Sequence, residues 1–264
     1  MPYRSLREFL DRLEAAGELV RVKERVDPVL EMAALADRAA KQGGPAFLFE
    51  RPTTGAFPVA MNLFGTRRRT SWALSCDDLE DPARELRALL KTAPPQSFWE
   101  KLKLLPKLGK LAAMTPKHAS SGPSQEVVER DPDVGRLPVL TTWPHDGGPF
   151  LTLPQVITRD PDTGVRNVGM YRVQVLGPRR LAMHWQLHKT ANAHYREYRR
   201  RGERMPVAIA LGGDPALTYC ASAPLPPNVD EYLFAGFLRG EAVRMVKGVA
   251  TDLDVPADAD IVIE

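Results

Sequence analysis

Cysteine is scarce in this chain of 264 residues. The two cysteines, Cys76 and Cys220, stand far apart and in no paired spacing. Disulfide frameworks and cysteine zinc sites need several cysteines at short intervals, so neither is indicated. We expect two reduced thiols with structural roles.

A long apolar run is missing as well. A membrane helix requires about 20 apolar residues in succession, and no stretch reaches that length. The first twenty residues carry charges throughout, whereas the centre of a signal peptide is apolar. We therefore expect the protein in the cytoplasm.

The sequence also lacks an excess of one charge. Its 36 basic and 33 acidic residues leave a net charge of +3, which gives no whole-molecule footprint for nucleic acid. The run Arg67-Arg68-Arg69 is typical of a solvated face, with an anion contact as the alternative. With 44% hydrophobic and 26% charged residues, the chain is long enough for one large or two ordinary globular domains.

The N-terminal part has the pattern of a small α/β unit. Ser5 can cap a helix with apolar residues at helical spacing, and Gly17 follows where a left-handed stop is needed. Asp27-Pro28 predicts the start of a second helix that ends at Gly43-Gly44. The apolar runs 46–49 and 59–63 predict buried strands, and 81–112 returns to helical spacing.

A segment without periodicity, 115–124, marks a domain boundary. We predict an N-terminal α/β domain over 1–118 and a mainly β, barrel-like domain over 125–264, an α+β chain overall. In the second domain we expect a hairpin turn at 160–164. The strand-like segments are 127–128, 151–158, 165–176, 181–185 and 259–264, and the helical ones are 190–201 and 229–238.

Chemistry-bearing side chains concentrate in NVGMYR, 167–172, and MHWQLHK, 183–189. Amide, imidazole and carboxylate groups together can hold Mn²⁺ or Mg²⁺, and the fork of Arg172 matches a carboxylate or phosphate. His184 and His188 lie four apart without an HExxH signature, which more often means ordinary surface or core residues. Trp185 is more typical of a core residue than of a stacking platform.

Two further positions leave alternatives open. Asn167 and Arg172 are an odd number apart, so a regular strand would point them to opposite faces unless Gly169 permits a bulge or a loop. Glu231 opens an apolar helix, where a carboxylate complements the helix dipole; its other role would be a third metal ligand.

At these residues the sequence resembles the UbiD family of decarboxylases, which includes polyprenyl-hydroxybenzoate decarboxylases of ubiquinone synthesis and related menaquinone-pathway and aromatic-acid enzymes. The resemblance covers essentially the whole chain in one order of motifs. These motifs are YRSLREFLDRLEAAGEL, GGPAFLFE, NLFGT, LPVLTTWPHDGGPFLTLPQVITRDPDTGVRNVGMYR, MHWQLHK, ALGGDPAL, EYLFAGFLRG and DLDVPADADIVIE.

The resemblance implies a split β-barrel, similar to flavin reductases, that holds prenylated flavin mononucleotide. It implies Mn²⁺, or Mg²⁺, bound by Asn167, His188 and Glu231 and bridging the cofactor phosphate, with K⁺ as a companion ion. Arg172 would be catalytic. The implied cofactor contacts are Met170, Tyr171, Arg172, His184, Trp185, Gln186, Lys189 and Thr190.

The same resemblance implies an aromatic or unsaturated carboxylic acid as substrate, 4-hydroxy-3-polyprenylbenzoate-like in quinone biosynthesis, a flavin prenyltransferase as cofactor supplier and a homo-oligomer in the full-length form. The sequence departs from the family after Glu264, because the EGPxGD/E segment with its two catalytic carboxylates is not in it. Two alternatives follow: a non-catalytic flavin- or metal-binding subunit, or a flavin reductase-like protein.

Overall fold

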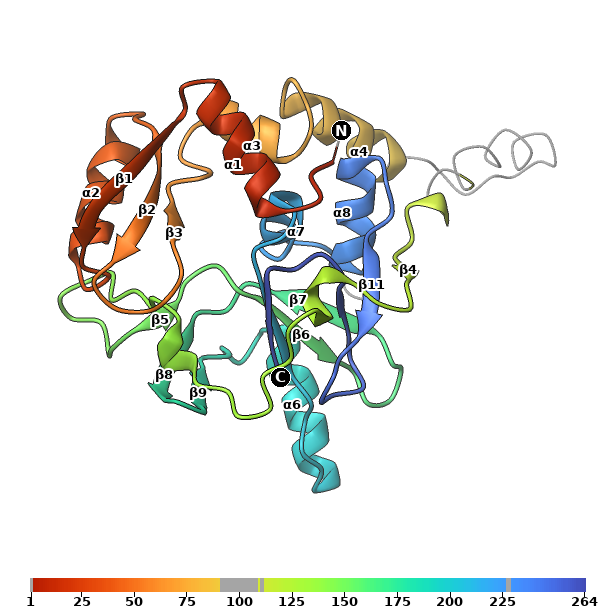
Figure 1. The fold of residues 1–264 in the computed structure, drawn as a ribbon. Helices are drawn as coiled ribbons and strands as arrows, with labels where there is room; N and C mark the ends of the chain where they lie inside the picture. Colours follow the sequence, from red (N-terminus) through yellow and green to blue (C-terminus); the bar gives the residue numbers. More distant parts are fainter. Residues whose placement is uncertain (1, 91–108, 110–111, 227–228) are drawn as a thin grey trace.

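The computed structural model describes residues 2–90, 109, 112–226 and 229–264 as a mixed α+β fold (Figure 1). Its N-terminal sheet, in red and orange, lies beside a larger region that contains the remaining strands. No helix in these described ranges is long and apolar enough to cross a membrane.

The N-terminal unit is built on one crossover. α1 (Leu6–Ala15) begins where the Ser5 hydroxyl accepts from the Glu8 N–H at 3.3 Å, and Gly17 follows it with a φ of +70°. Strand β1 (Leu19–Val26) pairs in parallel with β2 (Ala46–Pro52), and β2 pairs antiparallel with β3 (Val59–Met61). α2 (Glu31–Lys41) connects the two parallel strands, which confirms the predicted α/β pattern.

The predicted start of α2 is wrong by one turn. The Asp27 carboxylate accepts from the Val29 N–H at 2.8 Å, and Leu30 has a φ of +66°, so the segment at Pro28 forms a turn. The turn bonds to a distant segment, because the Leu30 N–H donates to the Thr141 carbonyl at 2.8 Å. A tertiary contact therefore holds the residues that local signals assign to the helix.

The solvated-face interpretation of the arginine run is wrong for its third member. The run lies in α3 (Arg67–Ala73), where Arg69 is fully buried and contacts Glu18 at 2.8 Å. Arg68 stacks on Trp72 at 4.6 Å from the ring centre. The run fastens α3 to the start of β1.

The following segment gives mixed outcomes. α4 (Glu80–Leu90) confirms helix in the first part of 81–112, and most of the remainder of that range lies outside the described residues. The strand expected at Val127-Val128 is wrong, since no strand forms there and the Val127 side chain is 80% exposed. Short 3₁₀ turns at Pro123–Gln125 (η1) and Val134–Arg136 (η2) flank this stretch.

Three sheets form the second region. A four-stranded sheet has the order β13-β10-β6-β7, and two three-stranded sheets have the orders β5-β8-β9 and β12-β11-β4. The bounds are β4 (Lys117–His118), β5 (Phe150–Leu151), β6 (Gln155–Arg159), β7 (Arg166–Gly169), β8 (Val173–Gly177), β9 (Arg180–Met183), β10 (Ala208–Leu211), β11 (Arg244–Lys247), β12 (Asp254–Pro256) and β13 (Ile261–Ile263). The predicted hairpin joins β6 to β7.

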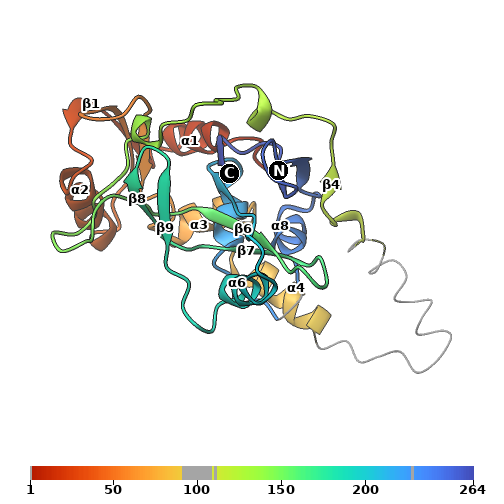
Figure 2. The ribbon, with the colours of Figure 1, turned by 90° about the horizontal axis from the view of Figure 1, so that it is seen from below.

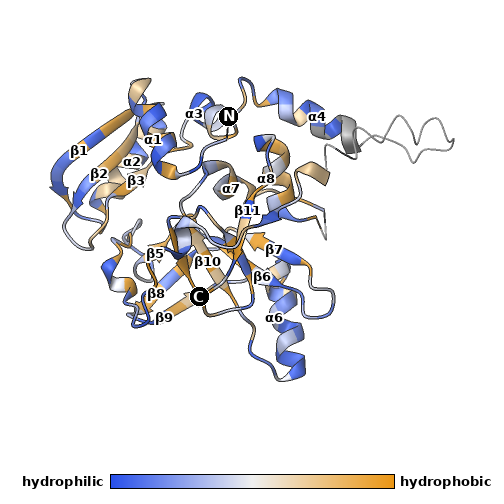
Figure 3. Ribbon diagram, turned by 45° about the vertical axis from the view of Figure 1, so that its right-hand side comes forward, coloured by the Kyte–Doolittle hydropathy of each residue, from blue (hydrophilic) through white to orange (hydrophobic). Residues whose placement is uncertain are grey.

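Helices complete the region. α6 (Thr190–Arg201) covers β6 and β7 (Figure 2), and most of its residues are hydrophilic (Figure 3). α7 (Pro215–Cys220) and α8 (Glu231–Arg239) pack against the main core, which includes Ile157, Tyr232 and Met245. The sheets are not joined into a closed barrel in the described residues, so the mixed α+β class is confirmed and the split barrel is not.

Candidate functional site

Asn167 lies in the interior of the four-stranded sheet. It stands opposite Thr158 in the β6–β7 register and its residue surface is only 6% exposed. Its Nδ2 donates to Thr158 Oγ1 at 3.3 Å. The Tyr171 hydroxyl also interacts with this amide, so partners on two residues orient it.

Glu231 reaches β7 from the first turn of α8. The helix cap is Asp230, whose carboxylate accepts from the Tyr232 N–H at 2.8 Å. Glu231 Oε2 instead accepts from the Val168 N–H at 2.9 Å, next to Asn167 in the sequence. Burial raises the pKa of Glu231 to about 7. Asp230 is thus the N-cap, while Glu231 lies in the first turn, where its carboxylate complements the helix dipole as considered, and also lies beside Asn167.

β7 ends at Gly169. The regular alternation that would point Asn167 and Arg172 to opposite faces therefore does not continue as far as Arg172. Residues 170–172 connect β7 to β8 outside regular strand structure. A Cβ on Gly169 would come within 2.3 Å of the Tyr171 ring, so the ring packs directly over the glycine backbone. Tyr171 is buried in a cluster with Leu151 and Val173.

Arg172 is held by a residue that sequence reasoning missed. Its two terminal nitrogens bond the two carboxylate oxygens of Asp146 at 3.1 and 2.8 Å, and its guanidinium lies 4.0 Å from the centre of the Phe150 ring. The Arg172 hydrogen bond is the main cause that lowers the pKa of Asp146 to about 2. The HDGG stretch around Asp146 signals only a turn, and the contact spans 26 residues.

The other predicted contacts lie on two neighbouring segments. Met170 packs against the main core, and its N–H donates to the Ala221 carbonyl at 2.8 Å. Trp185 is half-buried between Tyr171 and Tyr195, as a core residue would be. The exposed members of the set between β9 and the first turn of α6 are His184, Gln186, His188, Lys189 and Thr190.

His188 differs from the other two candidate metal ligands in its exposure. It is exposed, and no hydrogen bond or ion pair joins it to Asn167 or Glu231 in the described part of the chain. Among those residues, no three His, Cys, Asp or Glu side chains are grouped closely enough to hold a metal. Asn167 of β7 is an amide, and such a grouping does not include amides.

Glu264 has a structural role. Its carboxylate accepts from the N–H groups of Val249, Ala250 and Thr251 at 2.8, 2.6 and 2.6 Å. Three charge-assisted bonds tie this side chain to the loop after β11.

An apolar cavity of about 250 Å³ lies between the N-terminal unit and the second region. None of the predicted site residues lines it, although Phe150 does and also contacts Arg172. The remaining walls are largely aliphatic, with Leu63 and Leu140 from either side.

Comparisons with known proteins agree on one family. Residues 116–264 match the 3-octaprenyl-4-hydroxybenzoate carboxy-lyase Rift-related domain (UbiD), and residues 10–89 match the N-terminal domain of the same carboxy-lyase. An uncharacterized protein of Aquifex aeolicus is 49% identical over 99% of this chain and 54% of its own length. The chain thus spans about half the length of the curated relatives it matches.

Solved structures give the same result. The structure of an evolved dimeric form of the UbiD-class enzyme HmfF from Pelotomaculum thermopropionicum, in complex with prFMN, is 33% identical, with a TM-score of 0.83 over 98% of this chain and 56% of that one. Vanillic acid decarboxylase of Sedimentibacter hydroxybenzoicus in closed form is 28% identical, with a TM-score of 0.83 over 100% of this chain and 54% of that one.

Proposed function

Because the chain belongs to the UbiD family of carboxy-lyases, we propose that it holds prenylated flavin mononucleotide for the non-oxidative decarboxylation of an aromatic or unsaturated carboxylic acid. The observation that carries the proposal is the seating of Glu231 on the backbone of Val168, directly beside the buried Asn167. The likeness to an HmfF structure in complex with prFMN supports it.

The donor set fits a hard divalent cation. Amide and carboxylate oxygens are ligands that Mn²⁺ and Mg²⁺ accept, and the Asn167 amide nitrogen is already bonded to Thr158. The proposal takes Asn167 and Glu231 as oxygen ligands and His188, on the exposed segment before α6, as the third ligand. A cofactor phosphate would complete the site, with K⁺ as a companion ion.

The proposed role of Arg172 follows from its contacts. When bound, the prenylated flavin supplies an acceptor for the electron pair that remains when carbon dioxide leaves. Asp146 takes both terminal nitrogens of Arg172 and the Phe150 ring lies against the guanidinium, so this side chain is held in one orientation. A carboxylate or the cofactor would use the N–H groups of Arg172 that Asp146 leaves free. Tyr171 packs over Gly169 and keeps the 170–172 connection close to β7.

We take residues 125–264 as the cofactor domain of a split-barrel type and residues 1–118 as the N-terminal domain. A 4-hydroxy-3-polyprenylbenzoate of quinone biosynthesis is the first substrate to test, with a flavin prenyltransferase as cofactor supplier and a homo-oligomer as the working form.

Cofactor occupancy tests the proposal. The chain is purified from cells that co-express a flavin prenyltransferase, Mn²⁺ is added, and bound prenylated flavin is quantified by mass spectrometry. We expect stoichiometric cofactor that is lost in Asn167→Ala and Glu231→Ala but kept in Glu241→Ala, an exposed control. A folded chain without cofactor, or equal occupancy in all variants, would refute the proposal.

A further inference from the structure

The side chain of Asn167 has two ends of similar shape and opposite chemistry. Rotation of the amide by half a turn exchanges Oδ1 and Nδ2, and only the oxygen can bind a cation. In the structure Nδ2 points to Thr158 Oγ1 at 3.3 Å. The Tyr171 hydroxyl also interacts with the amide, and the Thr158 hydroxyl is its partner inside the sheet. The orientation of a proposed ligand therefore depends in part on what the Thr158 hydroxyl accepts and donates.

His194 determines the direction of that hydroxyl. Thr158 Oγ1 lies 3.0 Å from His194 Nδ1, and both side chains are buried, at 0% and 5% exposure. The hydroxyl has one hydrogen; once that hydrogen is given to Nδ1, only its lone pairs remain for Asn167. They can accept from Nδ2 but cannot donate to Oδ1.

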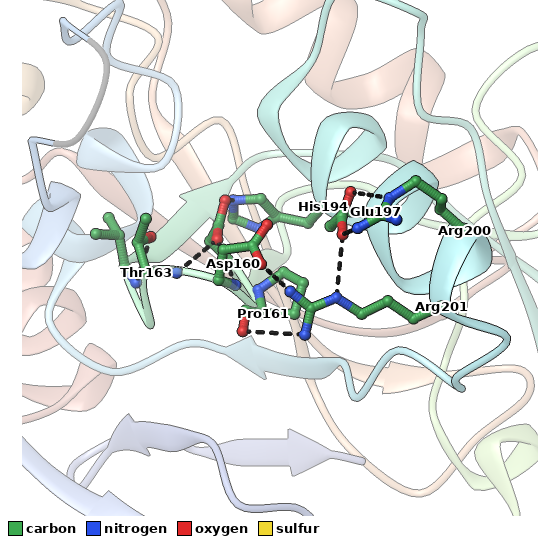
Figure 4. A network of polar contacts seen from close by, with 9 residues as sticks. Asp160, Pro161, Thr163, His194, Glu197, Arg200 and Arg201 are labelled. Atoms are coloured by element: carbon green, nitrogen blue, oxygen red, sulfur yellow. Dashed lines mark hydrogen bonds and ion pairs between the residues drawn. The ribbon is translucent and has the colours of Figure 1, made fainter.

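Asp160 favours the ring tautomer that this chain of bonds needs. Its Oδ2 lies 3.8 Å from His194 Nε2, which favours the proton on Nε2 and leaves Nδ1 as the acceptor. Asp160 is itself fixed, because its Oδ1 accepts from the N–H groups of Asp162 and Thr163 at 2.8 and 2.9 Å. Figure 4 shows His194 of α6 facing Asp160 in the β6–β7 turn.

The same contact sets the position of α6. Farther along this helix Arg201 donates to the Pro161 carbonyl at 3.4 Å (Figure 4) and pairs with Asp162, so the helix is fastened to the turn at two levels. The first turn of α6 starts at Thr190, directly after His188 and Lys189. The contact at His194 therefore lies between the buried candidate ligand, Asn167, and the exposed candidates His188 and Lys189.

We propose that Thr158 and His194 are positioning residues that present the amide oxygen, rather than the amide nitrogen, of Asn167 to a divalent cation. The inference rests on the proposed function, since it requires a cation at Asn167 and Glu231. It adds two residues that touch neither the cation nor the cofactor.

Mn²⁺ binding to the chain, without flavin, tests this inference. Thr158→Val keeps the branched shape of the side chain and removes the hydroxyl, whereas Thr158→Ser keeps the hydroxyl. Partners that orient a metal ligand typically change metal affinity by about 10–100-fold. We expect a weakening of that size in Thr158→Val and recovery to near the wild-type Kd in Thr158→Ser, measured from the free Mn²⁺ signal in electron paramagnetic resonance.

Thr218→Val is the matched control. Thr218 is also a buried threonine, in α7, and its hydroxyl lies 3.5 Å from Gln155 Nε2 instead of near Asn167. Its Mn²⁺ affinity should stay at the wild-type value. Equal weakening in both valine variants would point to general loosening and overturn the inference, as would wild-type affinity in a folded Thr158→Val. Absence of Mn²⁺ binding in the wild-type chain would instead count against the proposed function itself.

Discussion

Asp146 and Arg172 form a two-point ion pair in which both carboxylate oxygens face both terminal guanidinium nitrogens, at 3.1 and 2.8 Å. The pair joins the loop before β5 to the connection between β7 and β8. Thr142 adds a bond to the same guanidinium at 3.3 Å. The proposed catalytic arginine is thus held by an acid that precedes it by 26 residues.

Arg172→Gln is expected to raise the pKa of Asp146 from about 2 toward the usual value of about 4. The reason is that the Arg172 hydrogen bond is the largest influence that stabilises the Asp146 carboxylate. Carbon-13 NMR titration of the Asp146 side chain measures the change. Arg180→Gln, on β9, is the control and should leave the Asp146 titration where it is. A pKa that stays near 2 in Arg172→Gln would show that other contacts hold the carboxylate.

Gly169→Ala is expected to destabilise the protein by about 1–3 kcal/mol, the usual range for overpacking. The added methyl would stand 2.3 Å from the Tyr171 ring, and the ring is buried, so it must move. Urea unfolding measures the loss. In a Tyr171→Ala background the same glycine change should cost far less, because the steric partner is gone. Additive costs in the double variant would contradict this account.

Glu18→Ala is expected to cost about 3–5 kcal/mol, because it leaves the charge of a fully buried arginine without its carboxylate. Arg69 contacts Glu18 at 2.8 Å, and its Nε and second terminal nitrogen have no hydrogen-bond partner in the described residues. Denaturant unfolding at pH 7 measures this change in the free energy of unfolding. Glu14→Ala breaks an exposed pair with Arg21 and should cost much less. Similar losses in the two variants would mean that burial of Arg69 is not decisive.

Asp214 should make the protein less stable as the pH rises from about 4 to about 6. Burial raises its folded-state pKa to about 6, even though the Arg239 guanidinium, with Nε 2.7 Å away, acts in the opposite direction. In this window the folded state keeps a proton that the unfolded state has lost, so the free energy of unfolding falls as pH increases.

The shift of about two units corresponds to roughly 3 kcal/mol at about 1.4 kcal/mol per unit. Asp214→Asn removes that contribution, so the stability difference between wild type and variant should change by about this amount between pH 4 and pH 6.5. Asp37→Asn, at an exposed pair with Lys41, serves as the control and should keep the wild-type slope. A slope unchanged in Asp214→Asn would assign the pH dependence to another group.

Local patterns predicted the parts of the fold that local forces decide. The Ser5 cap, the turn after Arg159 and the helix from Thr190 were all readable, because capping, turn chemistry and helical spacing are properties of neighbouring residues. The resemblance then supplied the family, which the domain matches confirm.

The features that could not be predicted from the sequence depend on contacts between residues far apart in the chain. The segment at Pro28 follows a bond from Leu30 to Thr141 rather than its own helix signal. Buried Arg69 is paired with Glu18, which is 51 residues away in the sequence, and no periodicity indicates such a pair. β10 is only four residues long, and its pairing with β6 and β13 decides that it is a strand. Asp146 belongs to this group, since only the folded chain brings it to Arg172.

The bonds from Glu264 to the loop after β11 make that loop and β13 one cooperative unit. β13 lies at the edge of its sheet, paired with β10 on one side. If it lifts away, the carboxylate leaves with it, and the amides of Val249, Ala250 and Thr251 lose their acceptor together. Local opening at this edge is therefore expected to be all-or-none rather than gradual fraying.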